Sequence, residues 1–202
     1  MVQTVNKGLM EALERGGTVV TVNKRLARWL RADYARRQMS AGRTAWETPK
    51  AVAVGRWLWD CWERAVAGGA AGADAALIVL SPAQEAAVWE RVVTDSAAGR
   101  SLMAPERTAA EAARAYKLFH DYRLKPRDLD RASGDVQVFA GWMQEFDALC
   151  GREGWLSRVR LAEWLAALAL SGVRVAEGPL FFAGFDTVTP ALAHLKAVLQ
   201  NK

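Results

Sequence analysis

A short apolar run passes directly into a basic amphipathic helix between Thr18 and Arg37, and this junction limits the folds open to the chain. The run Thr18–Val22 has the β-branched composition of a buried strand, and a helical pattern begins at Lys24. Two further runs, Ala51–Val54 and Leu180–Gly184, are also continuously apolar rather than alternating. We therefore expect a parallel three-stranded sheet, covered on both faces and connected by helical crossovers.

Most of the chain between residues 76 and 175 has helical periodicity. Capping-box patterns at Ser81–Gln84 and Thr108–Glu111 predict the starts of two helices, and Ser133 is suited to cap a third. A fourth helix is expected over Arg158–Leu170. The fold class predicted from the sequence is therefore α/β but mostly helical, with an all-helical insertion of about 100 residues between strands two and three.

We expect two domains from this pattern: residues 1–75 together with 176–202 around the sheet, and residues 76–175 as the helical insertion. The glycine-rich stretch Ala67–Asp74 is a suitable boundary between them. The last expected helix begins with Thr189 as N-cap and Pro190 as its first residue. Three strands are few for an α/β domain, so we expect the chain to be a piece of a longer protein.

Composition excludes several classes of function. The chain has no apolar run of about 18 residues, which predicts no membrane-spanning helix, and its first residues lack the apolar core of a signal peptide. Cys61 and Cys150 lie on apolar helical stripes, which favours buried free thiols over a disulfide or a reactive site and indicates a cytoplasmic protein. His120 and His194 lack neighbours at ligand spacing, so we expect no metal site.

Basic residues are concentrated in one short segment. Between Asn23 and Arg43 the chain has seven basic residues and one acidic residue, Asp33. Two interpretations remain open: a solvated face above a buried Leu/Trp stripe, or a surface for a polyanion such as nucleic acid. The candidate contact residues are Lys24, Arg25, Arg28, Arg31, Arg36 and Arg43, with Trp46 beside them.

The nine tryptophans raise the question of base stacking. Most of them fit apolar stripes at helical spacing, which predicts core packing. Trp46 is the exception, because it lies in a polar turn between Arg43 and Pro49 and is the tryptophan we single out for contact with a base or a partner. The tryptophans expected to point inward are Trp29, Trp62, Trp89, Trp142 and Trp164.

The strand-to-helix corner is where many α/β proteins bind nucleotide phosphates, but the equipment for hydrolysis is missing. No GxxxxGK[ST] pattern occurs, and no lysine is followed by serine or threonine. Acidic-x-Lys triplets of the kind that nucleases use are also absent from the sequence. Asp186 follows the third expected strand, where α/β ligand sites lie, although a turn or capping role before Thr189 explains it equally well.

Several segments together resemble the B subunit of a bacterial helicase–exonuclease (AddB-like). They are Asn23–Leu30 with its N-x-R-L-A-R-x-L-like pattern, Trp46–Pro49, Trp57-Leu58 and the G-F-D-x-x-T-P element within Phe181–Leu199. This family of double-strand-break repair proteins is related to superfamily 1 helicases and carries a PD-(D/E)XK nuclease near its C-terminus. The resemblance implies a partial RecA-like (1A-like) subdomain in residues 1–75 and 176–202 and a 1B-like insertion in residues 76–175.

The resemblance also sets expectations for chemistry and partners. Asp186 matches the Walker B aspartate, but Thr187 stands where the catalytic glutamate would be, so we expect an inactive NTPase position with no cofactor. Any nuclease site would lie beyond Lys202. The function expected is therefore a catalytically degenerate scaffold, in the bacterial cytoplasm, that helps to bind DNA and a helicase–nuclease partner subunit. The alternative is a protein-interaction module that does not bind nucleic acid.

Overall fold

The structure is a computed structural model that describes residues 2–69, 77–129 and 134–200. The chain divides into two compact units, each made from two stretches of sequence. The sheet unit comprises Met1–Ala67 and Gly172–Val188, and the helical unit comprises Gly68–Ser171 and Thr189–Lys202. The expected grouping differs at the end of the chain, because the residues from Thr189 onward belong to the helical unit. Much of the expected boundary Ala67–Asp74 lies outside the described residues.

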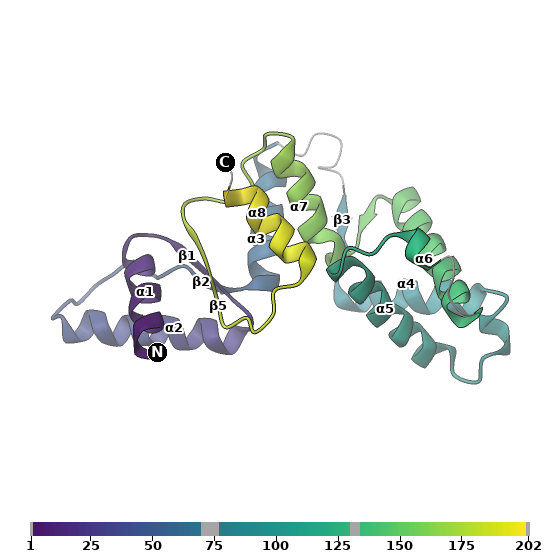
Figure 1. Ribbon diagram of the computed structural model, residues 1–202, viewed down its shortest axis with the longest axis horizontal. Helices are drawn as coiled ribbons and strands as arrows, with labels where there is room; N and C mark the ends of the chain where they lie inside the picture. The colour runs from purple at the N-terminus through teal and green to yellow at the C-terminus, as the bar shows by residue number, and fades with distance from the viewer. Residues whose placement is uncertain (1, 70–76, 130–133, 201–202) are drawn as a thin grey trace. The chain divides into compact units, whose positions relative to one another are not determined.

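The predicted parallel sheet is present in the sheet unit (Figure 1). Its strands are β1 (Thr18–Thr21), β2 (Ala51–Ala53) and β5 (Leu180–Ala183), in the order β2-β1-β5. β1 is the central strand and pairs in parallel with both neighbours. The fold class predicted from the sequence is therefore confirmed: a mostly helical α/β chain with a small three-stranded parallel sheet.

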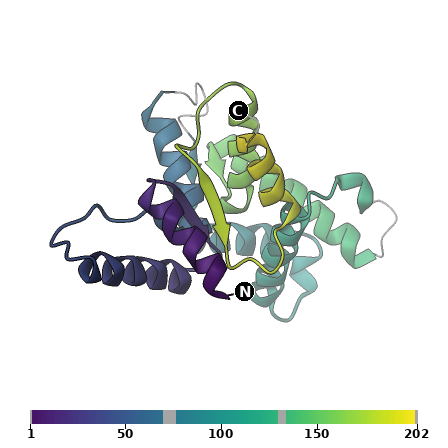
Figure 2. The ribbon, with the colours of Figure 1, turned by 60° about the vertical axis from the view of Figure 1, so that its left-hand side comes forward.

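Helices cover both faces of this sheet. On one face, α1 (Val2–Glu14) and α2 (Lys24–Ser40) join the strands in one apolar cluster that includes Met10, Val19 and Leu30. Figure 2 shows α1, in purple, against the strands. The same cluster contains Ala183 of β5. Because successive strand residues point to opposite faces, Phe182 belongs to the other face.

The helix α3 (Val54–Ala67) covers that second face and begins directly where β2 ends. The ring of Trp57 contacts Phe182 edge-on, with 5.8 Å between the ring centroids. Helical spacing predicts Leu58, Cys61, Trp62 and Ala65 as the inward side chains of this helix. In the structure Trp57, Cys61 and Ala65 are buried, whereas Leu58 and Trp62 are half-buried. The prediction is confirmed for Cys61 and Ala65. It missed Trp57, because the buried face of the helix is rotated so that the Trp57 ring packs against Phe182.

The helical unit contains five α-helices among its described residues, and Figure 1 shows the last two side by side. The expected capping box at Ser81 is present: the Ser81 hydroxyl accepts from the Gln84 amide, and the Gln84 side chain accepts from the Ser81 amide. The next helix begins at Pro105 rather than at Thr108, because proline provides the favoured first helical residue one turn earlier. Ser133 lies outside the described residues. The helices are α4 (Pro82–Asp95), α5 (Pro105–Asp121), α6 (Gly134–Glu153), α7 (Leu161–Leu170) and α8 (Pro190–Gln200).

The helical unit is not entirely helical, which corrects the expectation of an all-helical insertion. Two short strands, β3 (Ile78–Val79) and β4 (Trp155–Leu156), pair in parallel. Each has only two residues, which is too short for sequence periodicity to reveal it. The pair ties the start of the insertion to the chain just before α7.

Stacked aromatic rings form the centre of the helical unit. Trp89 of α4 stacks on Phe146 of α6 at 4.3 Å, and Tyr116 of α5 meets both rings edge-on. The Tyr116 hydroxyl donates to the Asp147 carboxylate at 2.6 Å. Leu149 and Cys150 lie on the same buried face of α6 as Phe146. Of the five tryptophans predicted to point inward, Trp89 is fully buried, with 0% of its surface exposed, and Trp142 packs against the same cluster.

Both cysteines are buried free thiols, as the sequence predicted. Burial is the main cause that raises the pKa of Cys61 to about 11 and that of Cys150 to about 12. Such thiols stay protonated at neutral pH, and the protonated form is a poor nucleophile. Their place in the fold is therefore structural.

A polar pair links α5 and α7. The side chain of His120 is almost fully buried, and its Nδ1 lies 3.0 Å from the Glu163 carboxylate. The hydrogen bond from His120 is the main cause that lowers the pKa of Glu163, and it outweighs the opposing effect of burial. This pair is a single contact between two helices, and no group of three potential metal ligands is found among the described residues.

Gly99 lies where any larger residue would collide with the backbone. A Cβ added there would lie 1.7 Å from the Val93 carbonyl oxygen, in the turn that follows α4. We predict that Gly99→Ala lowers the free energy of unfolding by more than about 2 kcal/mol. Gly141→Ala is the matched control, since Gly141 lies in α6 with open space around it and should gain up to about 1 kcal/mol. Urea denaturation measures both values, and equal losses would contradict the packing described at Gly99.

The pair His120–Glu163 predicts a pH-dependent contribution to stability. Because the pKa of Glu163 is lowered in the folded chain, its stabilisation is complete above the ordinary value of 4.5. It is lost as the pH falls through the lowered value. We predict that Glu163→Gln is less stable than the wild type at pH 7 and that this difference shrinks toward pH 3. Urea midpoints across this pH range measure it, and a constant difference would contradict the assignment.

Candidate nucleic-acid interface

Residues at the corner between β1 and α2 hydrogen-bond to one another. Only Val22 and Asn23 separate the strand from the helix. The Asn23 side chain accepts from the Leu26 amide at 2.9 Å and so caps α2, and the Thr21 hydroxyl donates to the Asn23 carbonyl at 2.8 Å. One of the amides that a phosphate could use at this helix N-terminus, that of Leu26, is therefore already bonded within the protein.

Three cations lie along one side of α2. Lys24, Arg28 and Arg31 are spaced by four and three residues, which places them on the same helical face, and all three are exposed. This face borders the buried one, where Ala27 and Leu30 pack toward the sheet. The cations therefore stand beside the sheet rather than at the far side of the helix.

These cations line a groove between α2, the edge strand β2 and the first turn of α3. The groove has a volume of about 240 Å³. Its charged lining consists of Lys24, Arg28, Arg31 and Arg56, and no acidic side chain lines it. The rest of the wall is small and apolar, formed by Ala27 and the strand residues 51–53. We call this hollow the basic groove. Four cations with no acidic side chain in the lining create a local positive potential, which the ion pairs of Arg56 weaken at one end.

Carboxylates begin where the basic groove ends. Arg56 contacts Asp60 at 2.6 Å and Glu63 at 3.6 Å along α3. Both acids line a second hollow of about 670 Å³, and Glu177 lines it with them. The two hollows adjoin, since Arg31, Arg56 and the strand residues 51–52 line both. Charge therefore changes from purely basic to mixed across Arg56.

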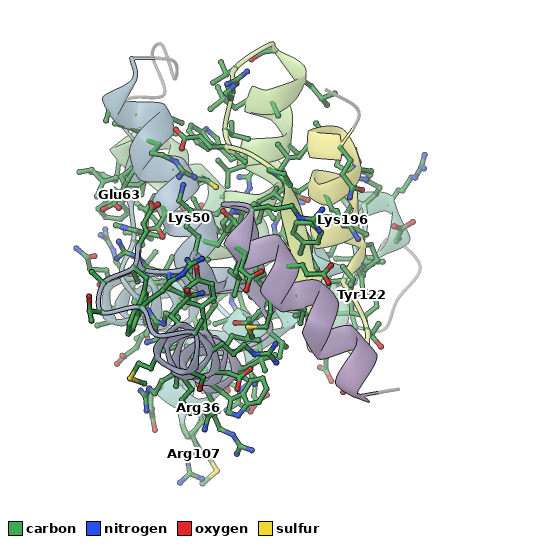
Figure 3. All side chains as sticks on the ribbon, turned by 90° about the vertical axis from the view of Figure 1, so that its left-hand side faces the viewer. Arg36, Lys50, Glu63, Arg107, Tyr122 and Lys196 are labelled. Atoms are coloured by element: carbon green, nitrogen blue, oxygen red, sulfur yellow. The ribbon has the colours of Figure 1, made fainter. Side chains whose placement is uncertain are left out.

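The other predicted contact residues lie elsewhere on the sheet unit. Arg36 is on the side of α2 away from Lys50 and Glu63 (Figure 3), and its guanidinium contacts Asp33 at 3.0 Å. Arg37 shares that carboxylate. Burial raises the pKa of Asp33, but the hydrogen bonds from Arg37 and Arg36 outweigh it and hold the pKa below its ordinary value. Arg36 is thus partly neutralised, as Arg56 is by Asp60 and Glu63.

Arg25 is exposed on the outward side of α2, and Arg43 is exposed beyond the end of that helix. Trp46 is half-buried and packs against the apolar cluster of α1 and α2. Asp186 is exposed in the segment after β5, next to Thr187. The structure therefore brings Lys24, Arg28 and Arg31 together in one groove and leaves the remaining predicted residues outside it.

The position of Trp29 differs most clearly from the one predicted from the sequence. This residue was predicted to point inward, yet 46% of its surface is exposed. The prediction assumed that the large apolar side chains of α2 face the core. The buried face of α2 is instead formed by Ala27, Leu30, Tyr34 and Gln38. The small Ala27 lets the helix lie close to the sheet and turns Trp29 away from it. The spacing of these four residues is the signal that could have revealed this face.

Arg56 is the contributor that sequence reasoning missed. It is far from the basic segment in the sequence and reaches the groove only because α3 begins where β2 ends, beside α2. A further hollow, of about 420 Å³, lies between α4 and α6 in the helical unit. It is lined by both signs of charge, with Arg91 and Arg152 beside Asp95 and Glu145, and so does not select an anion.

Comparison with known proteins adds no family assignment: no family model matches the chain, and a search of curated proteins finds no match. Within the described residues, no helix is long and apolar enough to span a membrane. The charge and shape of the basic groove are therefore the features of the molecule that bear on its function.

Proposed function

We propose that this chain is a DNA-contacting scaffold, and that the basic groove is where it holds DNA phosphates. The observation that carries the proposal is the acid-free lining of four cations: Lys24, Arg28, Arg31 and Arg56. A phosphate bound there displaces counterions from DNA, which makes binding favourable at low salt. Three of the four cations are arginines, whose planar forks suit phosphate oxygens.

The shape of the groove supports the same proposal. The small side chains of Ala27, Ala51 and Ala53 leave room for an anion to approach between α2 and the edge strand. Arg25 and Trp29 lie on the outward side of α2, which gives a cation and an exposed ring on the same helix as three of the groove cations. Phosphate contacts combined with an aromatic ring are typical of proteins that bind single strands.

In this proposal the chain forms the N-terminal part of an AddB-like helicase–exonuclease that repairs double-strand breaks in the bacterial cytoplasm. The sheet unit corresponds to a partial RecA-like (1A-like) subdomain, and the helical unit to a 1B-like insertion. No ATP hydrolysis is expected in this proposal, because the chain has no GxxxxGK[ST] pattern and Thr187 follows Asp186 in place of a glutamate. A helicase–nuclease partner subunit would supply the motor.

Charge reversal in the groove tests the proposal. We predict that Arg28→Glu/Arg31→Glu weakens binding of a labelled single-stranded oligonucleotide by at least about tenfold at low salt. The slope of log affinity against log salt should become shallower by about 0.7 for each lost phosphate contact. Fluorescence anisotropy across a salt series measures both quantities.

The control is Arg107→Glu/Arg127→Glu, which makes the same change in net charge at two exposed residues of the helical unit. It should retain more of the wild-type affinity than the groove variant. Equal losses in the two variants would show that net charge alone drives binding. Undetectable binding by the wild type at low salt would contradict the proposal and favour the alternative, a protein-interaction module.

Trp29, on the outward side of α2, gives a second prediction. Stacking of one base is worth about 1–3 kcal/mol, so Trp29→Ala should weaken binding to a single strand by at least about fivefold. Trp29→Phe should retain most of the affinity, and binding to a blunt duplex should change little because its bases are already stacked. Met39→Ala is the control, since Met39 is 56% exposed on the same helix but has no ring. Equal effects of Trp29→Ala and Met39→Ala would contradict a stacking role.

A further inference from the structure

The charge of the basic groove changes at one end. Asp60 and Glu63 hold Arg56 at that end, and both carboxylates line the mixed-charge hollow that follows, together with Glu177, Lys50 and Arg64. A nucleic-acid strand that passed straight through would bring its next phosphate toward these carboxylates, which is electrostatically unfavourable. A strand that stops at Arg56 avoids them.

We propose that the basic groove binds the terminal phosphate of a nucleic-acid strand. This inference rests on the proposed function, because it names the part of the nucleic acid that the groove takes. The last phosphate of the strand lies among the four cations of the groove, and the rest of the strand lies outside it. The groove is thus an end-binding site rather than a track along the phosphodiester backbone.

Charge favours a terminal phosphate over an internal one. A phosphodiester carries one negative charge, whereas a phosphomonoester carries about −1.5 to −2 at neutral pH, with a second pKa of about 6. Lys24, Arg28, Arg31 and Arg56 surround the groove without an acid in its lining. They therefore stabilise the more highly charged group more strongly.

Size favours the same ligand. Pockets for drug-sized ligands have volumes of about 300–1,000 Å³, and the basic groove at about 240 Å³ is smaller. It has room for one phosphate group with part of its sugar. The adjoining hollow has both acidic and basic side chains in its lining, so it does not add to the binding site for an anion.

The test compares oligonucleotides that differ only at their ends. Anisotropy competition with the full chain uses one single-stranded sequence with a 5′-phosphate, a 3′-phosphate or hydroxyl groups at both ends. We expect one phosphorylated form to bind about tenfold more tightly than the hydroxyl form at pH 7.5. The end that carries this advantage identifies the polarity of the strand in the groove.

Matched variants locate the effect. Arg28→Gln should abolish the preference for the phosphorylated end, whereas Arg25→Gln should keep it, because Arg25 lies outside the groove lining on the same helix. Both residues are exposed, so neither change disturbs the core. An equal loss of preference in both variants would overturn the assignment to the groove.

A pH series gives an independent readout. The preference, as the ratio of the two affinities, should fall between pH 7.5 and pH 5.5 as the terminal phosphate gains a proton. The groups that face the phosphate are Lys24, Arg28, Arg31 and Arg56, with Asp60 and Glu63 behind Arg56. A ratio that stays constant over this range would overturn the claim that the second charge is recognised.

The outcomes separate this inference from the proposed function. Equal binding of the phosphorylated and hydroxyl oligonucleotides would overturn end binding and leave DNA binding in place. No binding of either oligonucleotide would overturn both. Competition by inorganic phosphate at the same concentration that is as strong as by the phosphorylated oligonucleotide would overturn a nucleic-acid end as the ligand.

Discussion

Parallel pairing of β1 with both β2 and β5 is the constraint on which the sheet unit depends. Parallel neighbours require a crossover, so α2 must leave the end of β1 and return the chain to the start of β2. α3 then starts at the end of β2, which brings Arg56 beside the cations of α2. The basic groove is thus a consequence of topology. Both α2 and α3 begin at the carboxyl ends of neighbouring parallel strands, and their exposed side chains meet beside the outer strand β2.

The sequence was sufficient to predict the three strands of the sheet unit, their parallel pairing and the basic character of α2, because continuous apolar runs and helical spacing are local signals. It failed where packing decided the outcome. Trp29 was assigned to the core by its size, yet the small Ala27 and the polar Gln38 occupy the buried face. α8 was grouped with the sheet by its position in the chain, but the residues from Thr189 onward belong to the helical unit.

The candidate site was only half visible in the sequence for the same reason. Lys24, Arg28 and Arg31 could be placed together because helical spacing is known in advance. Arg56 joins them through a contact between distant segments, and the acids that limit the groove depend on ion pairs along α3. Trp46, which the sequence singled out, is half-buried against the core, whereas Trp29 is exposed.

The most direct measurement of the central claim is a crystal structure of the chain with a short single-stranded oligonucleotide phosphorylated at one end. We expect phosphate oxygens in the basic groove at hydrogen-bond distance, about 3 Å, from the side chains of Arg28 and Arg31. We also expect the strand to end before the carboxylates of Asp60 and Glu63. An oligonucleotide bound elsewhere, with the basic groove free of phosphate, would contradict it.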